Sequence, residues 1–193
     1  MPLGIKSMSE IIDKTYKKPI PKIARQIVKI IKKGEEPMHP LIDSIKLVGE
    51  IRLVLKDRHG NLKEDRLIKN TITSVGKAAV AGLMLADVGG TAFDYIAIGV
   101  GTPGATALGS ESTTNGGTRR GGANVTGTQV TTTVTNDTAQ WVTTFTFTGA
   151  LVLTEEGIFN ATEAGTMLAS QSFAALNIAD GDTLTITHKI KVA

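Results

Sequence analysis

Adjacent carboxylates at Glu155 and Glu156 are the residues whose types and spacing come nearest to catalytic chemistry. Two carboxylates can hydrolyse a glycosidic bond, provided that they flank a cleft. Both residues lie in an apolar segment with the pattern of a strand, and a carboxylate in such surroundings needs a partner. We therefore expect Glu155 or Glu156 to pair with Arg119, with Arg120 or with a neighbouring subunit.

Other candidate groups give weaker signals. Asp180 and Asp182 flank a glycine, which is typical of a turn, and the spacing does not continue into a calcium-binding loop. The chain has no Cys, and His39, His59 and His188 are far apart in the sequence, so no metal site is expected. No Gly-x-Ser-x-Gly segment occurs, which argues against a hydrolase with a serine nucleophile.

A glycine-rich segment, Gly99-Val-Gly-Thr-Pro-Gly104, formally fits the pattern of dinucleotide-binding loops. Such a site also requires a helix that begins at the loop, because the pyrophosphate binds at the helix N-terminus. Pro103 and the residues after it have no helical periodicity, so we interpret the segment as a strand end that turns into a loop. The sequence thus predicts no catalytic, cofactor-binding or metal-binding residues, and we expect a protein without enzymatic activity.

Charge divides the chain into two regions. The 193 residues have a formal net charge of +3. Residues 1–40 contain nine Lys or Arg and four Asp or Glu, whereas residues 41–193 contain twelve and fourteen, so the two regions carry +5 and −2. No apolar run is long enough to cross a bilayer, and no secretory signal pattern is found. We expect a protein made in the cytoplasm, with no membrane partner.

The basic N-terminal region predicts an amphipathic arm. Pro21 to Lys33 has a helical pattern, and Gly34 is a suitable stop. An apolar stripe and the cations beside it are the groups expected to anchor this arm to a partner: Ile23, Ile27, Ile30, Ile31, Lys22, Arg25 and Lys29. A short helix is marginal alone, so it needs a surface on which to bury the stripe.

From Ile45 onward the pattern is that of strands, most clearly in the alternating Thr and apolar residues of 124–147. The expected strands are 47–55, 62–68, 93–100, 124–135, 140–147, 151–159, 166–176 and 183–192. One helix is expected over 70–86, with Thr73 or Ser74 as its cap. We therefore predict a mainly β protein: an antiparallel β-sandwich or jelly-roll-like domain over 41–193 with one short helix, preceded by the helical arm over 1–40.

Several motifs occur in order along the β region: Lys56-Asp-Arg-His-Gly-Asn61, Ile68-Lys-Asn70, Gly76-Lys77, Ile96-Ala-Ile-Gly-Val-Gly-Thr102, Leu108-Gly-Ser-Glu111, Glu156-Gly-Ile-Phe-Asn-Ala161, Gly165-Thr-Met-Leu-Ala169 with Phe173, and Asp182-Thr-Leu-Thr-Ile186. Together they resemble a widespread group of small virion structural proteins of tailed bacteriophages, over about residues 46–192. The resemblance implies a component of the particle rather than an enzyme. The arm is not part of the shared pattern, so it is expected to be the adapter of this particle.

The resemblance favours a virion structural protein, assembled in the host cytoplasm and attached to the capsid, collar or tail through its arm. Its expected partners are other virion proteins and further copies of this chain, with a trimer as one candidate. The alternative is a receptor-binding or glycan-binding module of a fibre or spike, with a site between Gly101 and Asn124 or on the Thr-rich strands. A small glycan hydrolase using Glu155 and Glu156 ranks third, and nucleic-acid binding by the basic arm ranks fourth.

Overall fold

The computed structural model describes residues 45–85 and 90–193. The expected arm helix, its anchoring residues and the expected boundary at residue 40 lie outside the described residues. The elements are, in order, β1 (Leu47–Lys56), β2 (Leu62–Lys69), β3 (Thr71–Ile72), α3 (Ser74–Leu83), β4 (Tyr95–Gly99), β5 (Arg120–Gly121), the 3-10 turn η1 (Gly122–Asn124), β6 (Thr126–Val130), β7 (Thr138–Thr146), β8 (Leu151–Phe159), β9 (Met167–Ile178) and β10 (Thr183–Val192).

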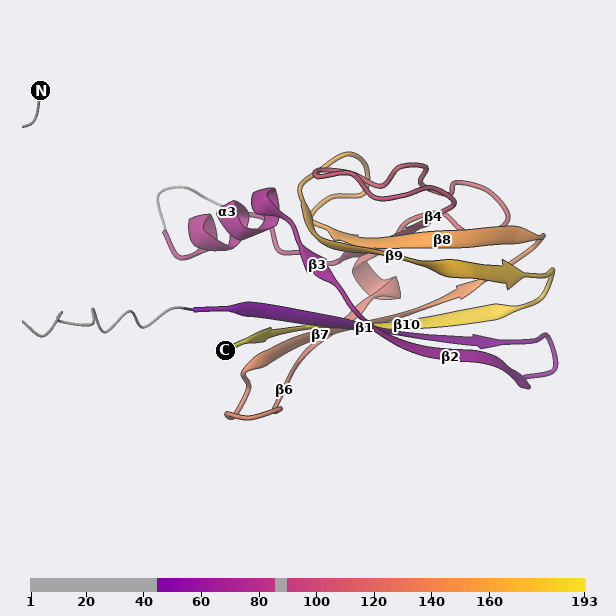
Figure 1. Ribbon diagram of the computed structural model, residues 1–193, viewed down its shortest axis with the longest axis horizontal. Coiled ribbons are helices and arrows are strands. Elements are labelled where there is room, and N and C mark those ends of the chain that lie inside the picture. The colour runs from indigo at the N-terminus through magenta and orange to yellow at the C-terminus, as the bar shows by residue number, and fades with distance from the viewer. Residues whose placement is uncertain (1–44, 86–89) are drawn as a thin grey trace, which may run out of the picture. The chain divides into compact units, whose positions relative to one another are not determined.

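The strands form two five-stranded antiparallel sheets (Figure 1). Sheet 1 has the order β2-β1-β10-β7-β6, and sheet 2 has the order β3-β9-β8-β4-β5. The first and last strands of the described region pair along their whole lengths, from Leu47 opposite Val192 to Lys56 opposite Thr183. These observations confirm the mainly β fold, its antiparallel sheets and, within the described residues, the single short helix.

Period-two alternation places the core between the two sheets. Along β10 every second residue is buried, and His188 falls in the same series as Leu184, Ile186 and Ile190. The apolar members of this series share one cluster with side chains of both sheets, among them Ile51, Leu53, Leu55, Ile96, Ile98, Leu153, Ile158 and Leu176. Each such side chain contributes about 1.5–3 kcal/mol on burial.

The outer face of sheet 2 has a second, smaller cluster. It consists of Ala97, Phe159 and Met167, with Leu108 packed against them. Leu108 belongs to the segment between β4 and β5, which folds back along β4: the Val100 N–H donates to Ser110 O (2.9 Å) and the Ser112 N–H donates to Ile98 O (2.8 Å). The loop therefore covers the outer face of sheet 2.

The structure shifts two of the expected elements. The helix begins at Ser74 rather than at Asn70, because Thr71 and Ile72 pair with β9 as β3 and Thr73 caps the helix, accepting from the Gly76 N–H at 2.9 Å. The first Thr-rich strand ends at Val130 rather than Thr135, because the Asp137 carboxylate accepts from nearby backbone N–H groups and holds a turn. Among the described helices, none is long and apolar enough to cross a membrane.

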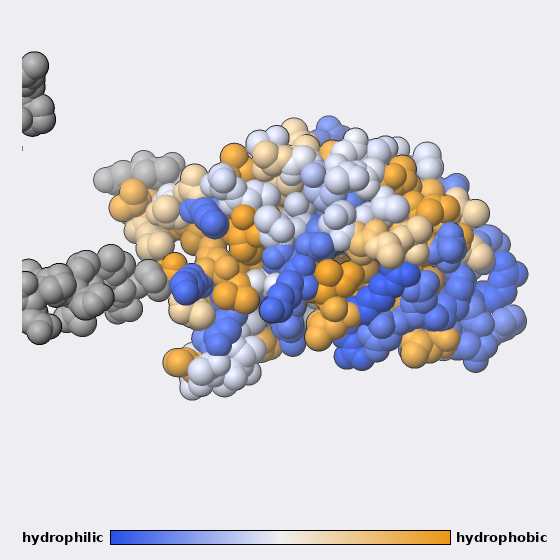
Figure 2. Space-filling model, in the orientation of Figure 1, coloured by the Kyte–Doolittle hydropathy of each residue, from blue (hydrophilic) through white to orange (hydrophobic). Residues whose placement is uncertain are grey.

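The two edge strands of sheet 1 differ in charge. Along β2 stand Lys63, Glu64, Asp65, Arg66 and Lys69, and Figure 2 shows hydrophilic surface over the β1–β2 hairpin. Along β6 the sequence is Thr-Gly-Thr-Gln-Val, which has no charge, and its first four residues are exposed. Charged edge strands resist pairing with another chain, so β2 is the protected edge and β6 is the open one.

Candidate functional site

Glu155 is fully buried, and it lies on the outer side of sheet 2 under the β4–β5 loop. The β8–β9 register shifts between Leu153 and Glu155, so that Leu153 still faces the core while Glu155 does not. The Glu155 carboxylate accepts three backbone N–H groups, from Gly101 (3.0 Å), Gly109 (2.8 Å) and Ser110 (2.7 Å). This carboxylate thus ties the start of the loop, at Gly101, and its middle, at Gly109 and Ser110, to β8.

The glycine pattern at 99–104 is explained by the same contact. A Cβ at Gly99 would lie 2.4 Å from the Glu155 carboxylate, and a Cβ at Gly101 would lie 2.7 Å from the Ser110 amide nitrogen. The small residues let the backbone approach closely enough to bind an anion, as they do in phosphate-binding loops. Here the anion is the side chain of Glu155, and the segment is the end of β4 turning into a loop, as predicted from the missing helix.

Glu156 is also fully buried, but it faces the space between the sheets. Its Oε1 lies 2.9 Å from Nδ1 of His188 on β10, and the Asn70 side-chain amide contacts Nε2 of the same ring. Each ring nitrogen of His188 thus faces one polar side chain, Nδ1 the Glu156 carboxylate and Nε2 the Asn70 amide. Gly49 leaves room for Asn70, since a Cβ there would lie 1.8 Å from Asn70 Oδ1. These residues join the two sheets through one buried polar network.

The expected pairing of the glutamates with Arg119 or Arg120 is not the one found. Arg119 forms a bidentate pair with Glu111 (2.9 and 2.6 Å), and its guanidinium lies 3.9 Å from the centre of the Phe159 ring. Arg120 donates to Gly116 O at 3.4 Å and lies over Phe145. Both glutamates are fully buried with partners in the chain itself, so they are not available to a neighbouring subunit.

The two carboxylates cannot act on one substrate in this arrangement. Glu155 contacts the loop outside sheet 2, whereas Glu156 contacts His188 inside the core. Glycosidase carboxylates must instead face each other across an accessible cleft.

Asp182 has a structural position as well: it accepts from the Ala179 N–H at 2.8 Å and pairs with Lys63. Within residues 45–85 and 90–193, no three His, Cys, Asp or Glu side chains gather as a metal site requires.

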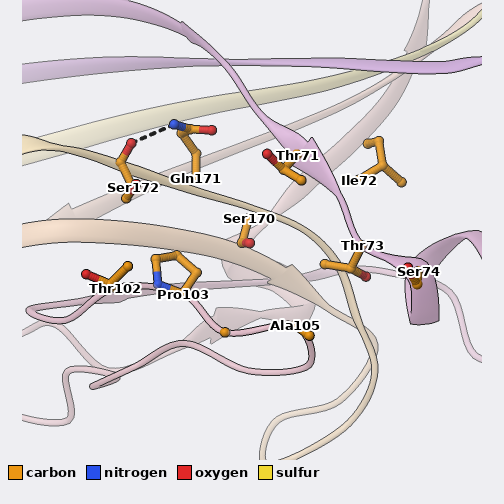
Figure 3. Close-up of a pocket in the computed structure, with 11 residues that line it drawn as sticks. Thr71, Ile72, Thr73, Ser74, Thr102, Pro103, Ala105, Ser170, Gln171 and Ser172 are labelled. Carbon is orange, nitrogen blue, oxygen red and sulfur yellow. Dashed lines mark hydrogen bonds between the residues drawn. The ribbon is translucent and has the colours of Figure 1, made fainter.

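Sequence reasoning missed a pocket rich in hydroxyl groups (Figure 3). It has a volume of about 350 Å³ and lies between the β3–α3 junction, the segment Thr102–Ala105 and β9. Six hydroxyl-bearing residues line it: Thr71, Thr73, Ser74, Thr102, Ser170 and Ser172. One wall, Thr102–Ala105, lies in the loop named above for a glycan site, but the sequence offered no signal for the walls from the β3–α3 junction and β9, which come from separate segments.

A second hollow lies between the start of β1 and α3. It is lined by apolar residues with two lysines among them, Lys46 and Lys77. Ile45, Val48 and Met84 are large side chains that are 68%, 50% and 66% exposed there. Figure 2 shows hydrophobic surface over this end of the domain. Clustered exposed apolar groups of this kind mark contact surfaces in many proteins.

No family model matches the chain, and no curated protein or solved structure matches it either. The function therefore rests on the geometry and on the ordered motifs. Of the residues expected to act at a site, Glu155, Glu156, Arg119 and Arg120 are engaged in contacts inside the domain. The arm residues expected to anchor the protein lie outside the described residues.

Proposed function

We propose that this chain is a bacteriophage virion structural protein whose β-sandwich domain is held on the capsid, collar or tail by the N-terminal arm. The observation that supports this best is where the motif residues fall in the fold. Asp57 closes the β1–β2 turn by accepting from the His59 and Asn61 N–H groups, both at 2.8 Å. Glu111 holds Arg119, and Asp182 holds the β9–β10 turn. The shared motifs thus supply architecture, as a particle component needs.

The arm supplies the attachment in this proposal. The four isoleucines of the expected stripe, Ile23, Ile27, Ile30 and Ile31, would be buried against a neighbouring virion protein, and burial of four such side chains contributes roughly 6–12 kcal/mol before entropy costs. Several arms of one homo-oligomer would act together and raise the effective affinity further. The apolar end of the domain around Ile45 and Met84 favours contact with other subunits as well.

Deletion of residues 1–40 tests this proposal. The truncated protein and the full chain are produced with an affinity tag in cells that make the particles, and purified particles are probed for each by immunoblot. We expect the full chain in particles and the truncated protein only in the soluble fraction, with unchanged unfolding of the β domain. Normal incorporation of the truncated protein, or absence of the full chain from particles, would overturn the proposal.

Two matched sets of substitutions in the full chain separate apolar from charged anchoring. Replacement of Ile23, Ile27, Ile30 and Ile31 by Ser removes the stripe and keeps the charge. Replacement of Lys22, Arg25 and Lys29 by Gln removes charge and keeps the stripe. The proposal expects the first set to abolish incorporation and the second to reduce it, with the reduction growing at low ionic strength.

A further inference from the structure

The hydroxyl-lined pocket has features of a ligand site that the architecture of the domain does not require. Ser170 is 5% exposed and lines the pocket, and Figure 3 places it between Thr73 and Pro103. Its hydroxyl is both a donor and an acceptor, so it can bind a ligand in the pocket.

The other hydroxyl groups differ in what they offer. The Thr73 hydroxyl is already engaged, because it accepts from the Gly76 N–H and donates to Met167 O. Gln171 donates from its side-chain amide to the Ser172 carbonyl at 2.6 Å, the bond drawn in Figure 3. Thr102 and Ser172 are exposed at the rim and keep their hydroxyl groups available to a ligand. Two walls also carry an apolar residue each, Ile72 from β3 and Pro103 from the loop.

The charges around the pocket select against an anion. None of the residues that line it is charged. The Gly76 N–H at the start of α3 is already bound by Thr73, and the Glu155 carboxylate binds the N–H of Gly101, next to the loop wall. A phosphate or carboxylate would thus meet no cation among the lining residues and would lie near a like charge.

We propose that this pocket binds one neutral saccharide residue of a glycan, with Ser170 as the hydrogen-bonding group at its floor. A sugar ring presents hydroxyl groups that both donate and accept, and these match the Ser and Thr hydroxyl groups of the pocket. Its C–H faces match Ile72 and Pro103. The volume is at the small end of the range of about 300–1,000 Å³ for small-molecule sites, which fits a single ring.

NMR titration of the isotope-labelled full chain tests the proposal. The probes are glucose, galactose, mannose, rhamnose and N-acetylglucosamine, each added into the millimolar range, with inorganic phosphate as the charged comparison. We expect at least one sugar to shift the backbone amides of Thr102, Ser170 and Ser172, and phosphate to leave them unchanged. No shift with any sugar, or shifts with phosphate alone, would overturn the saccharide site.

Variants connect the shifts to the pocket. Ser170→Ala removes one hydrogen bond and should weaken sugar binding about fivefold to tenfold. Thr102→Ala, at the exposed rim, should weaken sugar binding by a smaller factor. Because Thr102 is exposed, this variant should fold even if Ser170→Ala does not. Thr106→Ala, in the same loop but outside the pocket, is the matched control and should bind as the parent does. Equal affinity in all three variants would contradict the assignment. Particle incorporation does not enter this experiment, so its outcome is separate from that of the arm deletion.

Discussion

Glu155 and Glu156 are consecutive residues of β8 and both are fully buried, yet they stabilise two different regions. Outside sheet 2, Glu155 accepts backbone N–H groups of the β4–β5 loop. Between the sheets, Glu156 faces the side chain of His188. The two glutamates differ in whether the partners of the carboxylate can be removed by substitution. A side-chain partner can be replaced together with the carboxylate, whereas backbone N–H groups remain after any substitution of Glu155.

Replacement of Glu155 should therefore have the largest effect. Glu155→Ala leaves three backbone donors without an acceptor, and at about 1–3 kcal/mol for each donor we expect a loss of about 3–9 kcal/mol in unfolding free energy. Urea denaturation measures the loss. Hydrogen exchange should show the amides of Gly101, Gly109 and Ser110 losing protection first. Glu155→Gln keeps one acceptor oxygen and should lose less; a loss under about 1 kcal/mol for Ala would mean that water replaces the carboxylate.

The Glu156–His188 pair should behave in the opposite way. Glu156→Met or His188→Leu alone leaves a buried polar partner and should cost about 3–5 kcal/mol. The double variant removes both groups and leaves only the half-buried Asn70 amide without its partner, so it should lie within about 2 kcal/mol of the parent. A double-mutant cycle by urea denaturation gives the coupling energy. If the double variant loses as much unfolding free energy as the two single variants added together, Glu156 and His188 cannot be replaced as a pair, and the contrast with Glu155 is wrong.

Asp137 extends the comparison to the turn before β7, and its replacement by Asn should have the smallest effect. Hydrogen bonds from the backbone N–H groups of Val134, Thr132 and Thr133 hold the pKa of the Asp137 carboxyl well below its usual range. A lowered pKa in the folded state gives stability that is present above the unfolded-state pKa and is lost as pH falls through the folded-state pKa. Asp137→Asn should thus be less stable at neutral pH and less sensitive to acid.

Denaturation from neutral pH down to about pH 2 measures this effect. Some acid sensitivity should remain in the Asp137→Asn variant. The side-chain amide of Asn61 lowers the pKa of Asp57, and the Arg52 guanidinium lowers the pKa of Asp65. An acid dependence identical to that of the parent would show that the turn at Asp137 does not depend on the ionised carboxylate.

Local patterns predicted the long strands well. The β1–β2 hairpin and β10 follow from alternation and from the turn residues around Gly60, whose φ is 85°. The pattern could not predict β3, because a two-residue strand has no periodicity and the partner of Thr71, Ser170, is 99 positions away along the chain. The same pattern predicted a first Thr-rich strand that is too long. The β propensity of the residues after Val130 gives no sign that their backbone N–H groups donate to the Asp137 carboxylate instead of to a neighbouring strand.

The candidate site was predictable only in part. The position of Glu155 and Glu156 in an apolar strand predicted that each needs a partner, and the missing helix after 99–104 predicted a strand end that turns into a loop. That these two observations describe one contact was not visible, because Gly101 and Glu155 are separated by 54 positions. Glu156 has His188 as its partner, and not an arginine, because its side chain points toward β10. The bulge after Leu153 sets that direction. Such a bulge has no clear sequence signature.

The unequal edges of sheet 1 limit how far copies of this domain can polymerise. A strand from another molecule can add to β6, whereas addition to β2 would require its charged residues to lose water. If β6 of one copy pairs with β6 of another, the shared sheet is bordered by β2 on both sides. For the described residues, growth of sheet 1 by this route therefore stops at two molecules. A sheet with two open edges could instead add further molecules and form a fibril.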